Sequence, residues 1–141
     1  MKKIIMVVIL VLMLGILIKN IKKDVIPPIS KHEESLVSEY KKITPEQAKE
    51  MIDEEDVIIL DVRTPEEYRQ GHIDGALLLP DYDLENLAEN ELPHKDAKIL
   101  VYCRSGNRSR SSSKDLINMG YTMVYDFAGI NEWTYGIVKG E

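Results

Sequence analysis

The chain has 141 residues but only one cysteine, Cys103, so no disulfide can form within it. Its three histidines, His32, His72 and His94, do not have metal-site spacing with one another or with the cysteine. Five of its 18 basic residues are lysines in the first 23 positions, which contain no acidic residue. Residues 24–141 therefore carry 13 basic and 24 acidic side chains, a net charge of −11. An acidic body of this kind argues against binding to nucleic acid and against broad adhesion to anionic lipid.

The N-terminal residues hold the one long apolar run. Residues 4–18 are uninterrupted by polar side chains and have lysines on both sides. This length suits the apolar part of a signal peptide and is short for a membrane-spanning helix. Because no small-residue cleavage site follows, we expect residues 1–23 to be an uncleaved membrane anchor. The very short tail before residues 4–18 favours an extracytoplasmic position for the rest of the chain. Cleavage, and hence a secreted protein, is the alternative.

Two further regions follow the predicted anchor. Residues 24–42 form a linker that Pro27 and Pro28 stiffen, together with a short helix that a capping box at Ser30 opens. We expect the globular domain to span residues 43–141.

Strand and helix signals alternate along residues 43–141. Short apolar runs predict strands over 57–62, 76–79, 98–103 and 123–126. Capping boxes at Thr44 and Thr64 open helices, the second of which stops at Gly71. Further helices are predicted over 84–90, 109–119 and 131–135. The alternation predicts an α/β fold with a mostly parallel sheet.

Cys103 lies where a buried strand ends and the chain turns toward a helix, which is where open α/β sheets bind ligands. The free amides at the start of that helix, with Arg104, Arg108 and Arg110, offer positive charge. These donors should lower the thiol pKa below ~8.5 and produce a nucleophile in an anion-binding cup. The alternative is a small buried hydrophobic residue.

Several short motifs occur in a diagnostic order. They are Asp61-Val62-Arg63, Glu67-Tyr68, Gly71-His72-Ile73, Gly75-Ala76, Pro80, Cys103-Arg104-Ser105-Gly106-Asn107-Arg108-Ser109, Gly120-Tyr121, Gly129-Ile130 and Trp133. In this order they resemble the single-domain rhodanese, or thiosulfate sulfurtransferase-like, family. The resemblance implies a five-stranded, mostly parallel sheet with helices on both faces. It also implies an enzyme that transfers sulfane sulfur through a cysteine persulfide, with no metal or organic cofactor.

The resemblance assigns roles to particular residues. Cys103 is the expected catalytic residue, and the donor is a small sulfur anion such as thiosulfate. The acceptor is cyanide or a thiol, which includes a protein thiol. We expect an ion pair between Asp61 and Arg63, which either braces the cup or is purely structural. The substrate cup is formed by Arg104, Ser105, Gly106, Asn107, Arg108 and Ser109.

Two other functions stay open. Related phosphatases and arsenate reductases hold an oxyanion in a loop one residue longer, whereas four residues separate Cys103 from Arg108 here. A non-catalytic module that binds a partner or senses reactive sulfur is the second alternative.

The helix after the loop departs from the pattern of the family that the chain resembles, since Ser112 and Ser113 stand where paired alanines are common. We expect their hydroxyls to bond back to the preceding turn.

Overall fold

The computed structural model describes residues 39–140 of the chain. The predicted membrane segment over residues 4–18 and the short helix after it lie outside the described residues. Within residues 39–140, no helix has both the length and the apolar character needed to cross a membrane.

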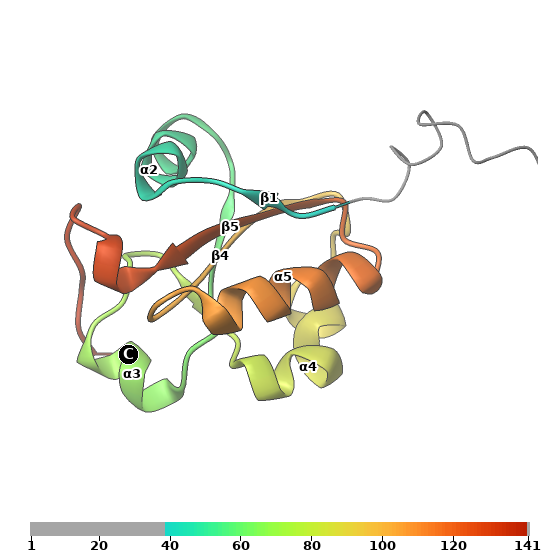
Figure 1. The fold of residues 1–141 in the computed structure, drawn as a ribbon. Coiled ribbons are helices and arrows are strands. Elements are labelled where there is room, and N and C mark those ends of the chain that lie inside the picture. The colour runs from blue at the N-terminus through green and yellow to red at the C-terminus, as the bar shows by residue number, and fades with distance from the viewer. Residues whose placement is uncertain (1–38, 141) are drawn as a thin grey trace, which may run out of the picture. The chain divides into compact units, whose positions relative to one another are not determined.

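A five-stranded sheet forms the centre of the described residues (Figure 1). Its order is β1-β5-β4-β2-β3, and every neighbouring pair is parallel. The strands are β1 (Lys41–Lys42), β2 (Ile58–Asp61), β3 (Leu77–Leu78), β4 (Lys98–Cys103) and β5 (Met123–Gly129). The predicted α/β fold with a parallel five-stranded sheet is therefore confirmed. β1 lies before Ile43, the predicted start of the domain. The sequence does not indicate this strand, because its two exposed lysines carry no hydrophobic pattern.

Helices cover both faces of the sheet (Figure 1). One face packs against α2 (Pro45–Glu54), and the other packs against α4 (Leu84–Glu91) and α5 (Asn107–Asn118). The short helix α3 (Pro65–Gln70) follows β2, and the 3-10 turn η2 (Asp81–Asp83) precedes α4. Side chains of β4 alternate between the faces, as a strand buried on both sides requires.

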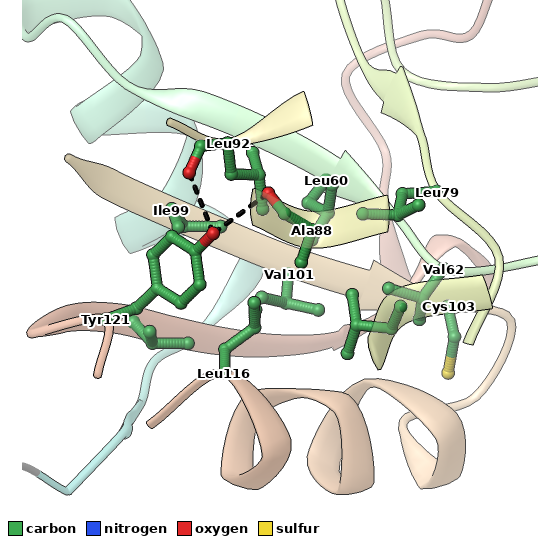
Figure 2. Packing of buried hydrophobic residues seen from close by; sticks show 12 residues of the cluster. Leu60, Val62, Leu79, Ala88, Leu92, Ile99, Val101, Cys103, Leu116 and Tyr121 are labelled. Carbon is green, nitrogen blue, oxygen red and sulfur yellow. Dashed lines mark hydrogen bonds between the residues drawn. The ribbon is translucent and has the colours of Figure 1, made fainter. Parts of the chain in front are cut away.

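The apolar cluster beneath α4 and α5 includes the side chain of one tyrosine, Tyr121 (Figure 2). Tyr121 is fully buried, and its hydroxyl lies 2.9 Å from the carbonyl oxygen of Ala88 and 2.7 Å from that of Leu92. These contacts tie the end of α4 to the segment that leads into β5. Cys103 belongs to the same cluster and lies at its end, next to the start of α5.

Three element boundaries differ from the sequence prediction. Helix α5 begins at Asn107, two residues before the predicted start, because Gly106 takes a left-handed φ of 98° and turns the chain directly into the helix. Strand β5 runs on to Gly129 through an irregular pairing with β4. The predicted helix over 131–135 is a single 3-10 turn, η3 (Ile130–Glu132).

The expectation for the Ser113 hydroxyl is wrong. Ser112 and Ser113 are both buried on α5, but Ser113 Oγ has no hydrogen-bond partner among the described residues. A buried hydroxyl without a partner costs roughly 1–3 kcal/mol, so the Ser113 hydroxyl lowers the stability of the fold.

Candidate active site

Cys103 is the last residue of β4, and the loop after it folds back over the sulfur. The left-handed Gly106 aims its own amide at Cys103, so that this N–H donates to Sγ over 3.1 Å. A Cβ on Gly106 would also lie 3.3 Å from Ala128, which leaves little room for a larger residue. The predicted convergence of loop amides on the thiol is therefore present at Gly106.

A bulge in β5 supports this loop from behind. Val101 pairs with Asp126 and Cys103 pairs with Gly129, so β5 has one residue more than β4 over this stretch. Ala128 lies within the bulge and has a left-handed φ of 70°. A Cβ on Gly129 would lie 2.1 Å from the carbonyl oxygen of Arg104, which means that only glycine allows the loop backbone to approach so closely.

The environment of the thiol lowers its pKa. Burial, with Cys103 only 1% exposed, would raise the pKa of the thiol. Hydrogen bonds from the amides of Ser109, Gly106 and Ser105 outweigh this and hold the pKa of Cys103 below its ordinary value. The site thus favours the thiolate, which is the nucleophilic form.

A buried carboxylate lies behind the sulfur. Asp126 is 1% exposed, and its Oδ1 accepts hydrogen bonds from the Ser109 hydroxyl over 2.7 Å and from the Ala128 amide over 3.0 Å. Ser109 Oγ also lies 3.7 Å from Cys103 Sγ. The contact of the Ser109 hydroxyl with Asp126 is shorter than its contact with the sulfur, so its proton points to Asp126. The backbone amides are therefore the main donors to the sulfur.

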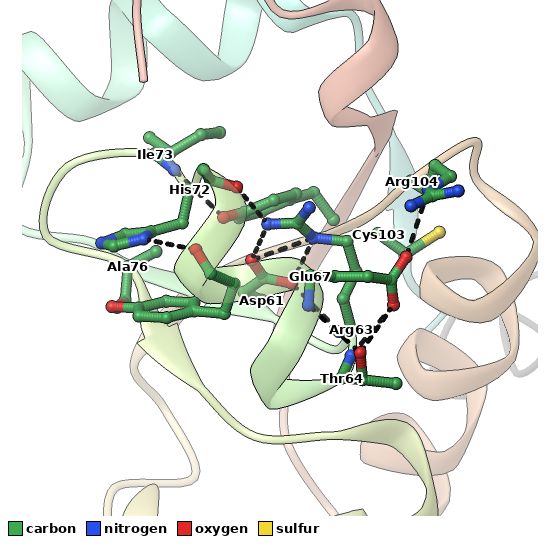
Figure 3. A network of polar contacts seen from close by, with 12 residues as sticks. Asp61, Arg63, Thr64, Glu67, His72, Ile73, Ala76, Cys103 and Arg104 are labelled. Carbon is green, nitrogen blue, oxygen red and sulfur yellow. Dashed lines mark hydrogen bonds and ion pairs between the residues drawn. The ribbon is translucent and has the colours of Figure 1, made fainter. Parts of the chain in front are cut away.

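Arg104 and Arg108 share the carboxylate of Glu67, and Figure 3 shows the contact with Arg104. Arg108 binds Glu67 through two hydrogen bonds of 2.8 Å, and Arg104 Nε lies 3.1 Å from Glu67 Oε1. The hydrogen bond from Arg108 lowers the pKa of Glu67 to about 2. Much of the positive charge expected of the cup is therefore balanced within the molecule by Glu67.

Asp61 and Arg63 form the predicted ion pair. Arg63 Nη2 lies 2.6 Å from Asp61 Oδ2, and the two side chains are 5% and 0% exposed. The same nitrogen donates to the carbonyl oxygen of Gly71 over 2.8 Å, at the end of α3. The pair therefore links the end of β2 to the end of α3 (Figure 3).

An open cleft of about 660 Å³ adjoins the loop. Cys103 is not part of its lining, whereas Glu67 and Arg104 are. Its lining includes the charged side chains of Arg63, Glu67 and Arg104 and the apolar side chains of Ile130, Trp133 and Ile137. A lining of this kind offers both charged and apolar contacts to a small ligand. In residues 39–140, no three or more His, Cys, Asp or Glu side chains form a group that could hold a metal ion.

The predicted site residues gather around Cys103, but with unequal exposure. Arg104, Ser105 and Asn107 are exposed, whereas Gly106 and Ser109 are buried against the sulfur. Sequence analysis missed the contributions of Glu67 and Asp126. Asp126 is the last residue of the strand predicted over 123–126. A polar residue at the end of a parallel strand often belongs to a ligand site, so this position could have indicated its role.

Comparison with known proteins agrees with this geometry. Residues 44–135 match the model of the rhodanese-like domain family. The chain belongs to the rhodanese-like domain family. The thiosulfate sulfurtransferase GlpE of Pseudomonas putida is 37% identical over 93 residues, which are 66% of this chain and 83% of that protein. The thiosulfate sulfurtransferase PspE of Escherichia coli is 35% identical over 81 residues, or 57% of this chain and 78% of its own length.

Solved structures of rhodanese domains have the same fold. A structure described as a rhodanese with anions from Escherichia coli is 33% identical, has a TM-score of 0.57, and is matched over its full length by 60% of this chain. A rhodanese-related protein from Thermoplasma volcanium is 29% identical with a TM-score of 0.63, and 72% of this rhodanese chain covers all of it. At the level of the family, this chain is a rhodanese domain with sulfurtransferase relatives.

Proposed function

We propose that the protein is a sulfurtransferase that moves sulfane sulfur from thiosulfate or a similar donor to a thiophilic acceptor through a persulfide on Cys103. The observation that carries the proposal is the amide of Gly106, which donates to Cys103 Sγ over 3.1 Å at the end of a buried parallel strand. A donor in this position stabilises sulfur in its anionic form, both as thiolate and as persulfide.

The reaction needs two displacements at sulfur. The Cys103 thiolate attacks the outer sulfur of thiosulfate, a bond forms between the two sulfurs, and sulfite leaves with the electron pair of the broken S–S bond. Cyanide or a thiolate then attacks the terminal sulfur and leaves as thiocyanate or a persulfide. The second step returns the Cys103 thiolate, so no external reductant is required.

Intact mass spectrometry of the full chain after thiosulfate treatment tests the proposal directly. We expect wild-type protein to gain one sulfur atom and to lose it again with cyanide. The Cys103→Ser variant should gain none. Steady-state thiosulfate and cyanide turnover should follow the same pattern.

Other outcomes would favour the alternatives. Absence of turnover with any donor, together with stable binding of a partner, would indicate a non-catalytic module. Activity on phosphotyrosine or on arsenate would indicate oxyanion chemistry, which the four-residue spacing between Cys103 and Arg108 disfavours.

We also propose that residues 4–18 anchor the protein in a membrane with the rhodanese domain on the extracytoplasmic face. The proposal rests on the apolar run with its flanking lysines. After cell fractionation, the full chain should remain with membranes. A membrane-impermeant thiol reagent should label Cys103 in intact cells, whereas labelling only after lysis would reverse the orientation.

A further inference from the structure

Glu67 forms ion pairs with both arginines of the loop, Arg104 and Arg108. The capping box to which Glu67 belongs does not require a negative charge. The capping boxes of α2 and α3 have nearly the same sequence, Thr-Pro-Glu-Gln and Thr-Pro-Glu-Glu. In α2, Gln47 Oε1 accepts from the Thr44 amide over 2.9 Å, and in α3, Glu67 Oε2 accepts from the Thr64 amide over 3.1 Å. Because a neutral amide caps α2 fully, the charge of Glu67 has no necessary role in capping α3.

The charge of Glu67 changes the net charge beside the loop after Cys103. The cation at Arg63, which also lines the cleft, is already balanced by Asp61. Arg104 and Arg108 therefore supply the remaining positive charge beside the loop, and both lie within 3.1 Å of Glu67. With the Cys103 thiolate included, these four groups sum to zero, and the buried Asp126 carboxylate behind the sulfur adds a further negative charge. A dianion that enters the site therefore adds two negative charges to a cluster with no net positive charge, whereas a monoanion adds one.

We propose that Glu67 is a specificity-determining residue for sulfur transfer: it neutralises part of the charge of Arg104 and Arg108 and so favours sulfur donors with one negative charge over donors with two. This inference rests on the proposed function of the site. It differs from the simple anion cup, in which two free arginines would select the most highly charged donor.

Two donors with matched chemistry provide the test. Thiosulfate carries two negative charges, and methanethiosulfonate carries one because a methyl group replaces an anionic oxygen. In both cases the Cys103 thiolate attacks the terminal sulfur and forms a persulfide, and the S–S bond breaks. The leaving group is sulfite from thiosulfate and methanesulfinate from methanethiosulfonate. The total charge is conserved in each reaction.

The experiment measures kcat/KM for both donors, with cyanide as acceptor, for the full-length wild type, Glu67→Gln and Glu66→Gln. Glu66 is exposed, is adjacent to Glu67, and makes no contact with Arg104 or Arg108, so its substitution matches the change in charge. We expect Glu67→Gln to raise the ratio of kcat/KM for thiosulfate to kcat/KM for methanethiosulfonate about tenfold. This change lies between the values that Coulomb's law gives for two charges ~6 Å apart in water and near a protein surface. The change should lie mainly in KM and shrink with added salt. Glu66→Gln should alter the ratio by less than about twofold.

A charge-restoring variant separates electrostatics from structure. Glu67→Gln combined with Arg104→Gln has the same cluster charge as the wild type, so the donor ratio should return close to the wild-type value. Arg104→Gln alone should lower the ratio. If Glu67→Gln does not fold, the double variant is compared with Arg104→Gln alone, and a ratio no higher in the double variant overturns the role of Glu67.

The outcomes that overturn the inference are distinct from failure of the proposed function. Wild-type turnover with a ratio that Glu67→Gln leaves unchanged, or that Glu66→Gln raises equally, overturns the role of Glu67 alone. If the wild type turns over neither donor, the proposed sulfurtransferase function is overturned and the role of Glu67 falls with it.

Discussion

Two carboxylate–arginine pairs lie near the end of β2, and they differ in what surrounds them. Asp61 and Arg63 are buried and lie two positions apart in the sequence, and Arg63 donates to the backbone at the end of α3. Glu67 and Arg108 come from distant parts of the chain, and their side chains are 15% and 30% exposed. The first pair is almost fully enclosed by protein, although Arg63 reaches the lining of the cleft, whereas the second pair is partly exposed beside Cys103. We therefore expect the first pair to affect mainly stability and the second to affect the charge that a substrate meets.

Breaking the enclosed pair should have the largest effect on stability. Asp61→Asn leaves the Arg63 guanidinium buried without a countercharge, which should lower the free energy of unfolding by about 3–5 kcal/mol. Urea unfolding of the full chain measures this loss. Asp53→Asn is the control, because Asp53 pairs with Lys49 on the exposed surface of α2 and should cost less than about 1 kcal/mol. Equal losses in the two variants would contradict the comparison.

Changing the second pair should affect activity more than stability. Arg108→Lys keeps the charge but loses the two parallel hydrogen bonds to Glu67. We expect kcat/KM for thiosulfate to fall about tenfold, equivalent to about 1.4 kcal/mol, with a smaller change in unfolding free energy. Arg110→Lys, on the exposed side of α5, should leave turnover unchanged. A larger loss of stability than of activity would place Arg108 with the enclosed pair.

Acid should weaken the second pair in a defined range. The folded pKa of Glu67 is about 2, below its unfolded value of ~4.3, so its stabilising contribution is complete above ~4.3 and is lost as pH falls through about 2. Because Arg108 is partly exposed, we expect this contribution to be about 1 kcal/mol. Urea midpoints at about pH 5 and about pH 2.5 should show a larger acid loss in the wild type than in Glu67→Gln. Parallel losses would mean that the ion pair adds no stability.

The smallest expected effect concerns the group behind the sulfur. Ser109→Ala removes a hydroxyl that lies between Asp126 and Cys103, so the carboxylate would face the sulfur without an intervening donor. The pKa of Cys103 should rise, and the pH profile of iodoacetamide alkylation should move to higher pH. Ser111→Ala, on the exposed side of α5, is the matched control. An unchanged profile would assign the low pKa to the amides alone.

The sequence could predict the features that depend on neighbouring residues. The buried strands, the two capping boxes and the loop after Cys103 each have a local pattern, and the structure confirms them. β1 could not be found in this way, because two lysines become a strand only through pairing with β5. The bulge in β5 likewise depends on the loop that it supports.

Glu67 illustrates the same limit within the site. Its place in a capping box already gives the residue a sufficient local explanation. Its contact with Arg108 spans 41 positions in the sequence and exists only after α3 and α5 pack on their parts of the sheet. No pattern in a single sequence specifies that contact.

The pairing of Val138 with His72 has a practical consequence for anyone who prepares the protein. Each of these residues donates its amide to the carbonyl of the other over 2.9 Å, and Ile137 beside them forms part of the cleft wall. The matched family region ends at residue 135, so shortening the protein to that region would discard this wall. A preparation that ends at residue 135 would therefore lack both Ile137 and the two backbone hydrogen bonds to His72.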